Sequence, residues 1–142
     1  MAGYLTGLTA DSINVFWDSI KNAILKGNKK ADFLKWYPLD HIKQRLLNAE
    51  WQCWHSDETY FLTCISIYPS GYKEFEILLV CGEHMDEWNE SAWNLLKAYA
   101  AYHGSDEIKW QGRKGWARYG KAIEPDLLTE YRYRVKLCQV AE

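Results

Sequence analysis

The fold of this chain is decided by the stretch Lys73-Glu74-Phe75-Glu76-Ile77-Leu78-Leu79-Val80-Cys81. Apolar and charged residues alternate at its start, and its last five residues are all apolar. Alternation predicts a strand with one buried face, and a run that is apolar on both faces predicts a strand in the centre of a sheet. We therefore expect residues 73–81 to form the central strand.

Two further strands are predicted before it. Tyr60–Tyr68 is rich in aromatic and β-branched residues, and Glu50–Ser56 contains two tryptophans and a cysteine. The link Pro69-Ser70-Gly71 is typical of a hairpin, and Ser56-Asp57-Glu58 is a short polar turn. We expect Tyr60–Tyr68 to pair antiparallel with Lys73–Cys81, and the helix that carries Trp93 to pack on the sheet.

Two helices are predicted before the strands. The first has an apolar face with helical spacing, formed by Ile13, Phe16, Trp17, Ile20 and Ile24. Thr9 or Asp11 can cap its start, and Gly27 can end it, with a polar turn over residues 27–30. The second helix should begin after Pro38, which suits a first helical turn.

Four elements are predicted after the central strand. They are a helix with Trp88, Trp93 and Leu96 that ends near Gly104, a short strand at Glu107–Trp110, a short basic helix at Gly112–Gly120, and a strand at Glu130–Leu137. The order is α-α-β-β-β-α-β-α-β. This order predicts an α/β fold in which helices flank a mixed central sheet.

Composition places the chain among globular proteins. With 142 residues, 25% charged and 48% hydrophobic, we expect one domain over residues 1–142. The longest apolar runs have five residues, far fewer than the roughly 20 of a membrane span, and no signal peptide is expected at the start. Four cysteines without paired spacing favour a reduced, intracellular protein. Eight tryptophans indicate either a large aromatic core or an interaction surface.

The order of elements resembles the GCN5-related N-acetyltransferase (GNAT) fold over roughly residues 9 to 138. The segments Leu95–Gly104, Ile108–Trp110 and Gly112–Arg118, with Trp88 before them, are similar to GNAT-like reading frames of tailed bacteriophages. This resemblance implies a GNAT-like sheet, and acetyl-CoA as the cofactor if the protein is an enzyme.

The resemblance also implies site residues. Tyr119 is the nearest match to the tyrosine that protonates the leaving thiolate, and Glu76, or Glu74, on the central strand could act as general base. Alternation with apolar residues makes these two glutamates solvent-facing in the expected strand. Gly82, Arg113 and Lys114 are the candidates to hold the CoA phosphates.

The sequence departs from the family in the phosphate-binding loop. Active members have a glycine-rich loop there, whereas the stretch 81–88 has one glycine and three carboxylates, on Glu83, Asp86 and Glu87. Residues 83–107 contain six acidic residues and one basic residue, a net −5. These carboxylates would repel a pyrophosphate, although acidic residues also simply favour the first turn of a helix. We expect no pyrophosphate-binding nest at Gly82–Trp88, and no bound cofactor.

The C-terminal third is basic and aromatic. Residues 109–136 contain eight Lys and Arg and three acidic residues, a net +5. Such a segment can bind nucleic acid, an acidic protein surface or only solvent. The candidate contact residues are Trp88, Trp116, Arg118, Arg132 and Arg134. Trp116 is expected to anchor the Gly112–Gly120 helix on the sheet.

Metal and thiol chemistry are not expected. Cys53, His55, Cys81 and His84 lack the spacing of a zinc site, and Cys81 lacks the partners of a nucleophile.

The leading hypothesis is a non-catalytic GNAT-like phage protein that acts through protein contacts, in the virion, in assembly or on the host. Its partners would be other virion proteins or further copies of itself, and it would reside in the host cytoplasm or the virion. The alternatives are an active acetyl-CoA-dependent N-acyltransferase and a nucleic-acid-binding module. No membrane association is expected.

Overall fold

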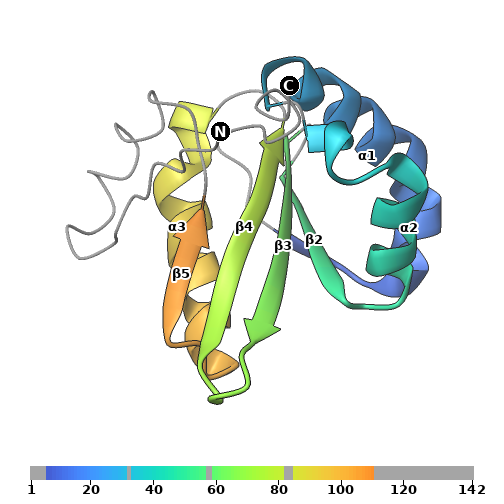
Figure 1. Cartoon of the computed structure of the whole chain (residues 1–142). Helices are drawn as coiled ribbons and strands as arrows, with labels where there is room; N and C mark the ends of the chain where they lie inside the picture. Colours follow the sequence, from blue (N-terminus) through green and yellow to red (C-terminus); the bar gives the residue numbers. More distant parts are fainter. Residues whose placement is uncertain (1–5, 32, 57–58, 82–84, 111–142) are drawn as a thin grey trace, which may run out of the picture.

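The computed structural model describes residues 6–31, 33–56, 59–81 and 85–110, which include a five-stranded mixed sheet (Figure 1). The strands are β1 (Thr6–Leu8), β2 (Trp51–Ser56), β3 (Thr59–Ile67), β4 (Lys73–Cys81) and β5 (Glu107–Trp110). They lie side by side in this order, and all neighbours are antiparallel except β4 and β5, which are parallel. The predicted mixed sheet is confirmed.

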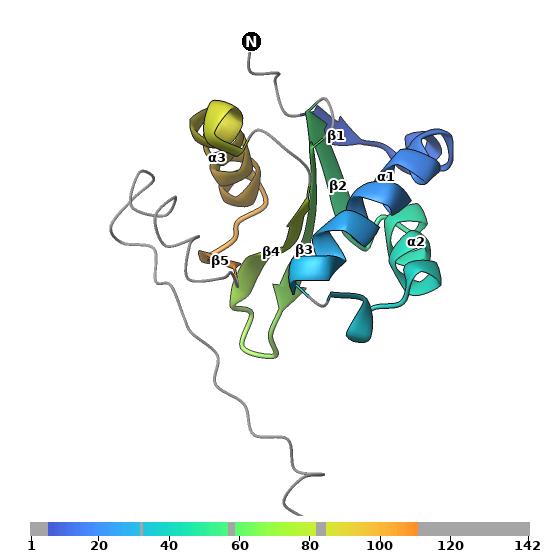
Figure 2. The ribbon, with the colours of Figure 1, turned by 90° about the horizontal axis from the view of Figure 1, so that it is seen from above.

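Helices lie on both faces of the sheet. They are α1 (Ala10–Ala31), α2 (Leu39–Leu47) and α3 (Met85–Tyr102), with a 3-10 turn η1 (Phe33–Lys35) before α2. Figure 2 shows α1 and α2 on one side of the sheet and α3 on the other. The three described layers are those expected from the sequence.

Helix α1 starts as predicted but ends later. Thr9 caps its start, because the Ser12 amide donates to both the Thr9 carbonyl and the Thr9 hydroxyl. The prediction that Gly27 ends the helix is wrong, since α1 continues to Ala31. Gly27 instead packs against β4, where an added Cβ would lie 2.9 Å from the Cβ of Cys81. Its lack of a side chain therefore serves close packing of helix on strand.

The predicted hairpin joins β3 to β4. Residues 60–67 pair antiparallel with residues 73–81, as expected. The turn closes with hydrogen bonds from the Tyr68 amide to the Tyr72 carbonyl and from the Gly71 amide to the Tyr68 carbonyl. Gly71 has a φ of +89°, which glycine adopts without strain.

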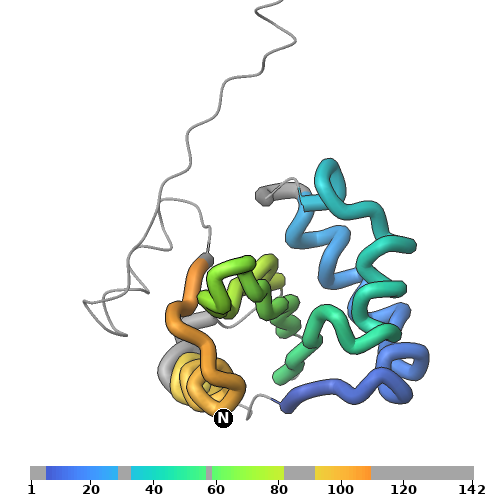
Figure 3. The backbone as a smooth tube through the Cα atoms, turned by 60° about the horizontal axis from the view of Figure 1, so that its bottom comes forward, coloured from blue at the N-terminus to red at the C-terminus, as the bar shows by residue number. Residues whose placement is uncertain are grey.

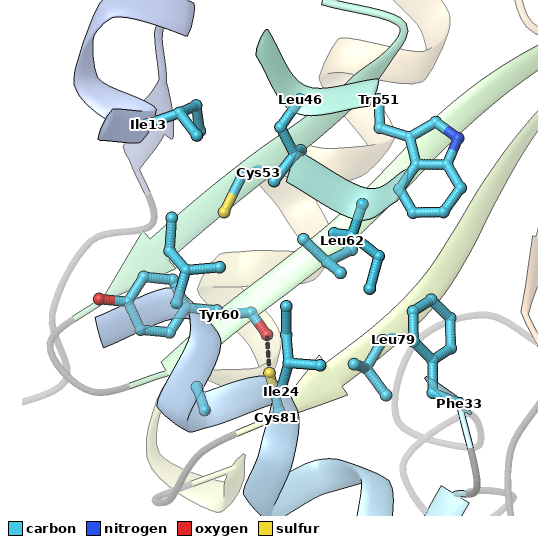
Figure 4. Close-up of a cluster of buried hydrophobic side chains, with 13 residues drawn as sticks. Ile13, Ile24, Phe33, Leu46, Trp51, Cys53, Tyr60, Leu62, Leu79 and Cys81 are labelled. Carbon is cyan, nitrogen blue, oxygen red and sulfur yellow. Dashed lines mark hydrogen bonds between the residues drawn. The ribbon is translucent and has the colours of Figure 1, made fainter. Parts of the chain in front are cut away.

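Two hydrophobic cores share the sheet. The first lies under α1 and α2 and contains Ile24, Leu62 and Leu79, all buried (Figure 4). The second lies under α3, where Trp93 and Leu96 pack with Phe75 and other sheet residues. This second core confirms that the Trp93 helix packs on the sheet. Burial of each large apolar side chain contributes about 1.5–3 kcal/mol.

Strand β1 was not predicted. It has three residues, too few for a periodic signal, and it pairs with β2 through Thr6↔His55 and Leu8↔Cys53. Gly7 leaves room for the indole of Trp54, whose Cζ3 would lie 3.3 Å from an added Cβ.

The helix and strand predicted at 112–120 and 130–137 lie outside the described residues, so that these two elements and the single-domain interpretation stay predictions. Among the described helices, none is both long and apolar enough to cross a membrane.

Candidate functional site

The regular alternation of side chains between the two faces of the sheet is interrupted in the middle of β4. Leu62 of β3 pairs with Leu79, but the next residue, Thr63, pairs with Ile77, so Leu78 is an extra residue. This register shift is a β-bulge, which rotates the strand locally. Before the bulge Ile77 packs under α3, and after it Leu79 packs under α1 and α2. The apolar run that marked this strand therefore contributes to both cores.

The same alternation places both glutamates of β4 on the side of α1 and α2. Phe75 and Ile77 face α3, so Glu74 and Glu76 project from the opposite face. The expectation that these positions face solvent is wrong for Glu74, which is only 6% exposed. Glu76 is half-buried.

Glu74 has two partners from neighbouring elements. The Tyr68 hydroxyl, from the hairpin, donates to Glu74 Oε1 at 3.3 Å. Lys109 Nζ, from β5, lies 3.8 Å from the same oxygen. The charge of Glu74 in turn raises the pKa of the Tyr68 phenol, since a nearby carboxylate opposes its ionisation.

Glu76 lies between β3 and β5. In the strand register it is opposite Cys64 on one side and Lys109 on the other. Burial, with a smaller contribution from the charge of Glu76, raises the pKa of the Cys64 thiol to about 11. Lys109 therefore lies close to Glu74 and pairs with Glu76 in the register of the sheet.

A third carboxylate completes the cluster. Glu107 of β5 pairs with Glu74 in register, and the nearby Glu107 carboxylate raises the pKa of the Tyr72 phenol. We call the set of Tyr68, Tyr72, Glu74, Glu76, Glu107 and Lys109 the tyrosine-acid face. It carries three carboxylates and one ammonium group. Chemically it can accept a proton or attract a cation.

Sequence reasoning identified only the two glutamates of this face. Lys109, Glu107 and the two tyrosines were not selected. The spacing of Glu107 and Lys109, two residues apart in a strand, placed them on one side, but the parallel register with β4 was needed to bring them to Glu74 and Glu76.

Most of the other predicted site residues lie outside the described part of the chain. They are Gly82, Arg113, Lys114, Trp116, Arg118, Tyr119, Arg132 and Arg134. Trp88 lies in the first turn of α3. The roles of Tyr119 as general acid and of Trp116 as an anchor therefore stay predictions.

The connection between β4 and α3, where the phosphate loop is expected, is short in sequence. β4 ends at Cys81 and α3 begins at Met85, so three residues join them. Asp86 and Glu87 consequently fall in the first turn of α3. The expectation that this loop forms no pyrophosphate-binding nest stays a prediction, because residues 82–84 lie outside the described part of the chain.

The buried thiols are not placed for nucleophilic chemistry. Cys81 Sγ donates to the Tyr60 carbonyl at 3.7 Å (Figure 4), and burial raises its pKa to about 12. Burial also raises the pKa of Cys53. Within the described residues, no group of three or more His, Cys, Asp and Glu side chains, the carboxylates of the tyrosine-acid face included, is arranged so that it could hold a metal ion.

Comparison with known proteins gives structural similarity only. No protein-family model matches the chain, and no curated protein matches its sequence. A predicted acetyltransferase of Clostridium acetobutylicum, solved with acetyl-CoA, aligns with a TM-score of 0.65 and 13% identity over 100% of both chains. A GCN5-related N-acetyltransferase of Ralstonia eutropha aligns with a TM-score of 0.63 and 15% identity, over 92% of this chain and 97% of the other.

A ribosomal-protein-alanine N-acetyltransferase of Brucella melitensis also aligns. Its TM-score is 0.58 at 11% identity, with 93% of this chain and 96% of the other covered. At such identities the similarity concerns the fold and not the activity. The chain has the mixed sheet and flanking helices of the GCN5-related N-acetyltransferases.

Proposed function

We propose that this protein uses a GNAT fold for protein contacts and does not bind acetyl-CoA in the manner of the enzymes that share the fold. The observation that carries this proposal is the acidic start of α3. The helix begins four residues after β4 ends, and its first turn contains Asp86 and Glu87.

The charge of this segment disfavours a pyrophosphate. Glu83 precedes α3 and Glu90 follows its first turn, so four carboxylates lie within eight positions. Two like charges 4 Å apart repel by about 1 kcal/mol in water and by about 4 kcal/mol near a protein surface. Several such terms offset the attraction between an anion and the helix N-terminus, which is typically about 0.3–1 kcal/mol for a single exposed charge.

The resemblance to GNAT-like reading frames of tailed phages extends the proposal to a virion, assembly or host-interaction role. The opposed charges of residues 83–107 and 109–136 support a contact function, since complementary surfaces favour association.

Isothermal titration of the full chain with acetyl-CoA tests the proposal. We expect no binding heat at about 1 mM ligand, a concentration that would detect even interactions of about −4 kcal/mol. The triple variant Glu83→Gln, Asp86→Asn, Glu87→Gln should bind more tightly than the wild type. Asp18→Asn, which removes an exposed charge from α1, is the control. Micromolar binding by the wild type would overturn the proposal.

The second candidate is an N-acyltransferase, which the position of Glu76 favours. This carboxylate is half-buried, lies two residues before the β4 bulge and faces Lys109 in the sheet. It could accept the proton of an acceptor ammonium group, and Tyr119 would be the candidate to protonate a leaving thiolate.

A thiol-release assay with acetyl-CoA and an amine acceptor tests the second candidate. Release that is lost in Glu76→Gln and retained in Asp18→Asn would support catalysis. Release that is unchanged in Glu76→Gln would exclude Glu76 as the base.

A further inference from the structure

The tyrosine-acid face lies at the end of the sheet that α1 and α2 leave free. In Figure 1 the β3–β4 hairpin extends beyond both helices, and Figure 3 shows the hairpin end standing between α3 and the α1–α2 pair. Tyr68 and Tyr72 at this end are 45% and 42% exposed. Tyrosine is enriched at protein interfaces because its large ring contacts a partner at low entropic cost.

Both tyrosines lie beside carboxylates of the sheet. Their rings lie 6.5 Å apart, the Tyr68 hydroxyl donates to Glu74, and the charge of the nearby Glu107 acts on the Tyr72 phenol. Ordered rings beside an excess of carboxylates are suited to Lys and Arg side chains, which gain both ion pairs and cation–π contacts.

The sequence itself contains a complementary partner. Residues 113–136 carry seven Lys and Arg against three acidic residues. Strand β5 runs parallel to β4, and its register passes from Glu74↔Glu107 to Ile77↔Trp110, so the chain proceeds away from the hairpin end as it approaches this segment. This direction favours contact with another copy.

We propose that the tyrosine-acid face binds the basic C-terminal third of a second copy of this chain. The contact joins two different surfaces and is therefore head-to-tail, an arrangement that builds rings or open chains. The inference rests on the proposed contact function and names one partner for it.

Sedimentation velocity of the full chain at about 0.1 M and about 1 M NaCl tests this inference. We expect association at the lower salt and monomers at the higher one, because the screening length falls from about 10 Å to about 3 Å. Glu107→Lys should weaken association about tenfold or more, since like charges then meet. Asp18→Lys makes the same change of charge on α1 and should associate like the wild type.

A charge-swap experiment identifies the surface on the other copy. The double variant Arg132→Glu, Arg134→Glu should also be monomeric alone. Mixed with Glu107→Lys, it should form assemblies in which the two variants alternate, because the two altered surfaces are again complementary and the two unaltered surfaces still are. A wild type that is monomeric at both salt concentrations, or a mixture that fails to associate, would overturn the inference. Neither result bears on acetyl-CoA binding, which tests the proposed function separately.

Discussion

At the scale of a single residue, the burial of Glu74 differs from the burial that its position in the strand pattern predicts. Alternation predicts an exposed carboxylate, whereas the side chain is buried among contacts from the hairpin and from β5. A buried charge is costly unless it is paired and hydrogen-bonded. Tyr68 and Lys109 supply the hydrogen bond and the opposite charge, and they lie 41 positions apart in the sequence.

The thiol of Cys81 sets an alkaline limit on stability. Burial raises its pKa from 9.0 to about 12 in the folded state. The contribution of this thiol to the unfolding free energy is therefore complete below about pH 9. It is lost as the pH rises toward 12, because the thiol ionises at lower pH in the unfolded chain than in the folded one. Between these values we expect each such thiol to lower the unfolding free energy by up to about 1.4 kcal/mol per pH unit.

Urea unfolding of the wild type and of Cys81→Ala at about pH 8, 9 and 10 measures this effect. The variant should be less stable at pH 8 because a cavity forms, but its stability should fall less steeply with pH. Cys53, whose pKa burial also raises, leaves a residual slope. Identical slopes in the two proteins would show that Cys81 does not titrate in this way.

At the scale of elements, the contact between α1 and β4 depends on Gly27. Alanine favours helix over glycine by about 1 kcal/mol, so an exposed Gly27→Ala would stabilise α1. Here the new methyl would lie 2.9 Å from the Cβ of Cys81, and crowding of this kind costs typically about 1–3 kcal/mol. We therefore expect Gly27→Ala to lower the unfolding free energy in urea.

Ser19→Ala is the control for Gly27→Ala. Ser19 is exposed on the same helix, and its replacement tests helix propensity alone, with an expected gain of a few tenths of a kcal/mol. A gain of stability in both variants would mean that α1 can move away from β4 without cost.

At the scale of the whole molecule, the two cores share β3 and β4. Leu62 faces α1 and α2, its neighbour Phe61 faces α3, and the β4 bulge sends residues to both sides. Loss of either core therefore removes packing from the same two strands that carry the other core. We therefore expect the described elements to unfold in a single transition.

Leu96→Ala tests this coupling from the α3 side. Leu96 is fully buried, so the substitution should cost about 2–5 kcal/mol. Circular dichroism reports the helices, and tryptophan fluorescence reports Trp51 and other indoles of both cores. The two signals should shift together to lower urea concentration. Separate transitions in the variant would show that the cores unfold independently.

The local pattern of apolar residues in the sequence was sufficient to predict the position of each helix and strand that buries one continuous apolar face. The bounds of β4 and β5 agree with the prediction, and each of β2 and β3 differs from it by one residue at one or both ends. Helix α2 begins directly after Pro38 as predicted, and α3 begins three residues before Trp88. The sequence also determined the hairpin, because Gly71 is suited to the positive φ that the turn needs.

Only the tertiary structure decided features that depend on residues far apart in the chain. Strand β1 is held by the edge of β2, and α1 continues through Gly27 because β4 accepts its backbone closely. The bulge at Leu78 and the parallel register of β5 bring Lys109 and Glu107 to the glutamates of β4. Periodicity reports which face of an element is buried, whereas the neighbour that covers it depends on register and packing, which no local pattern contains.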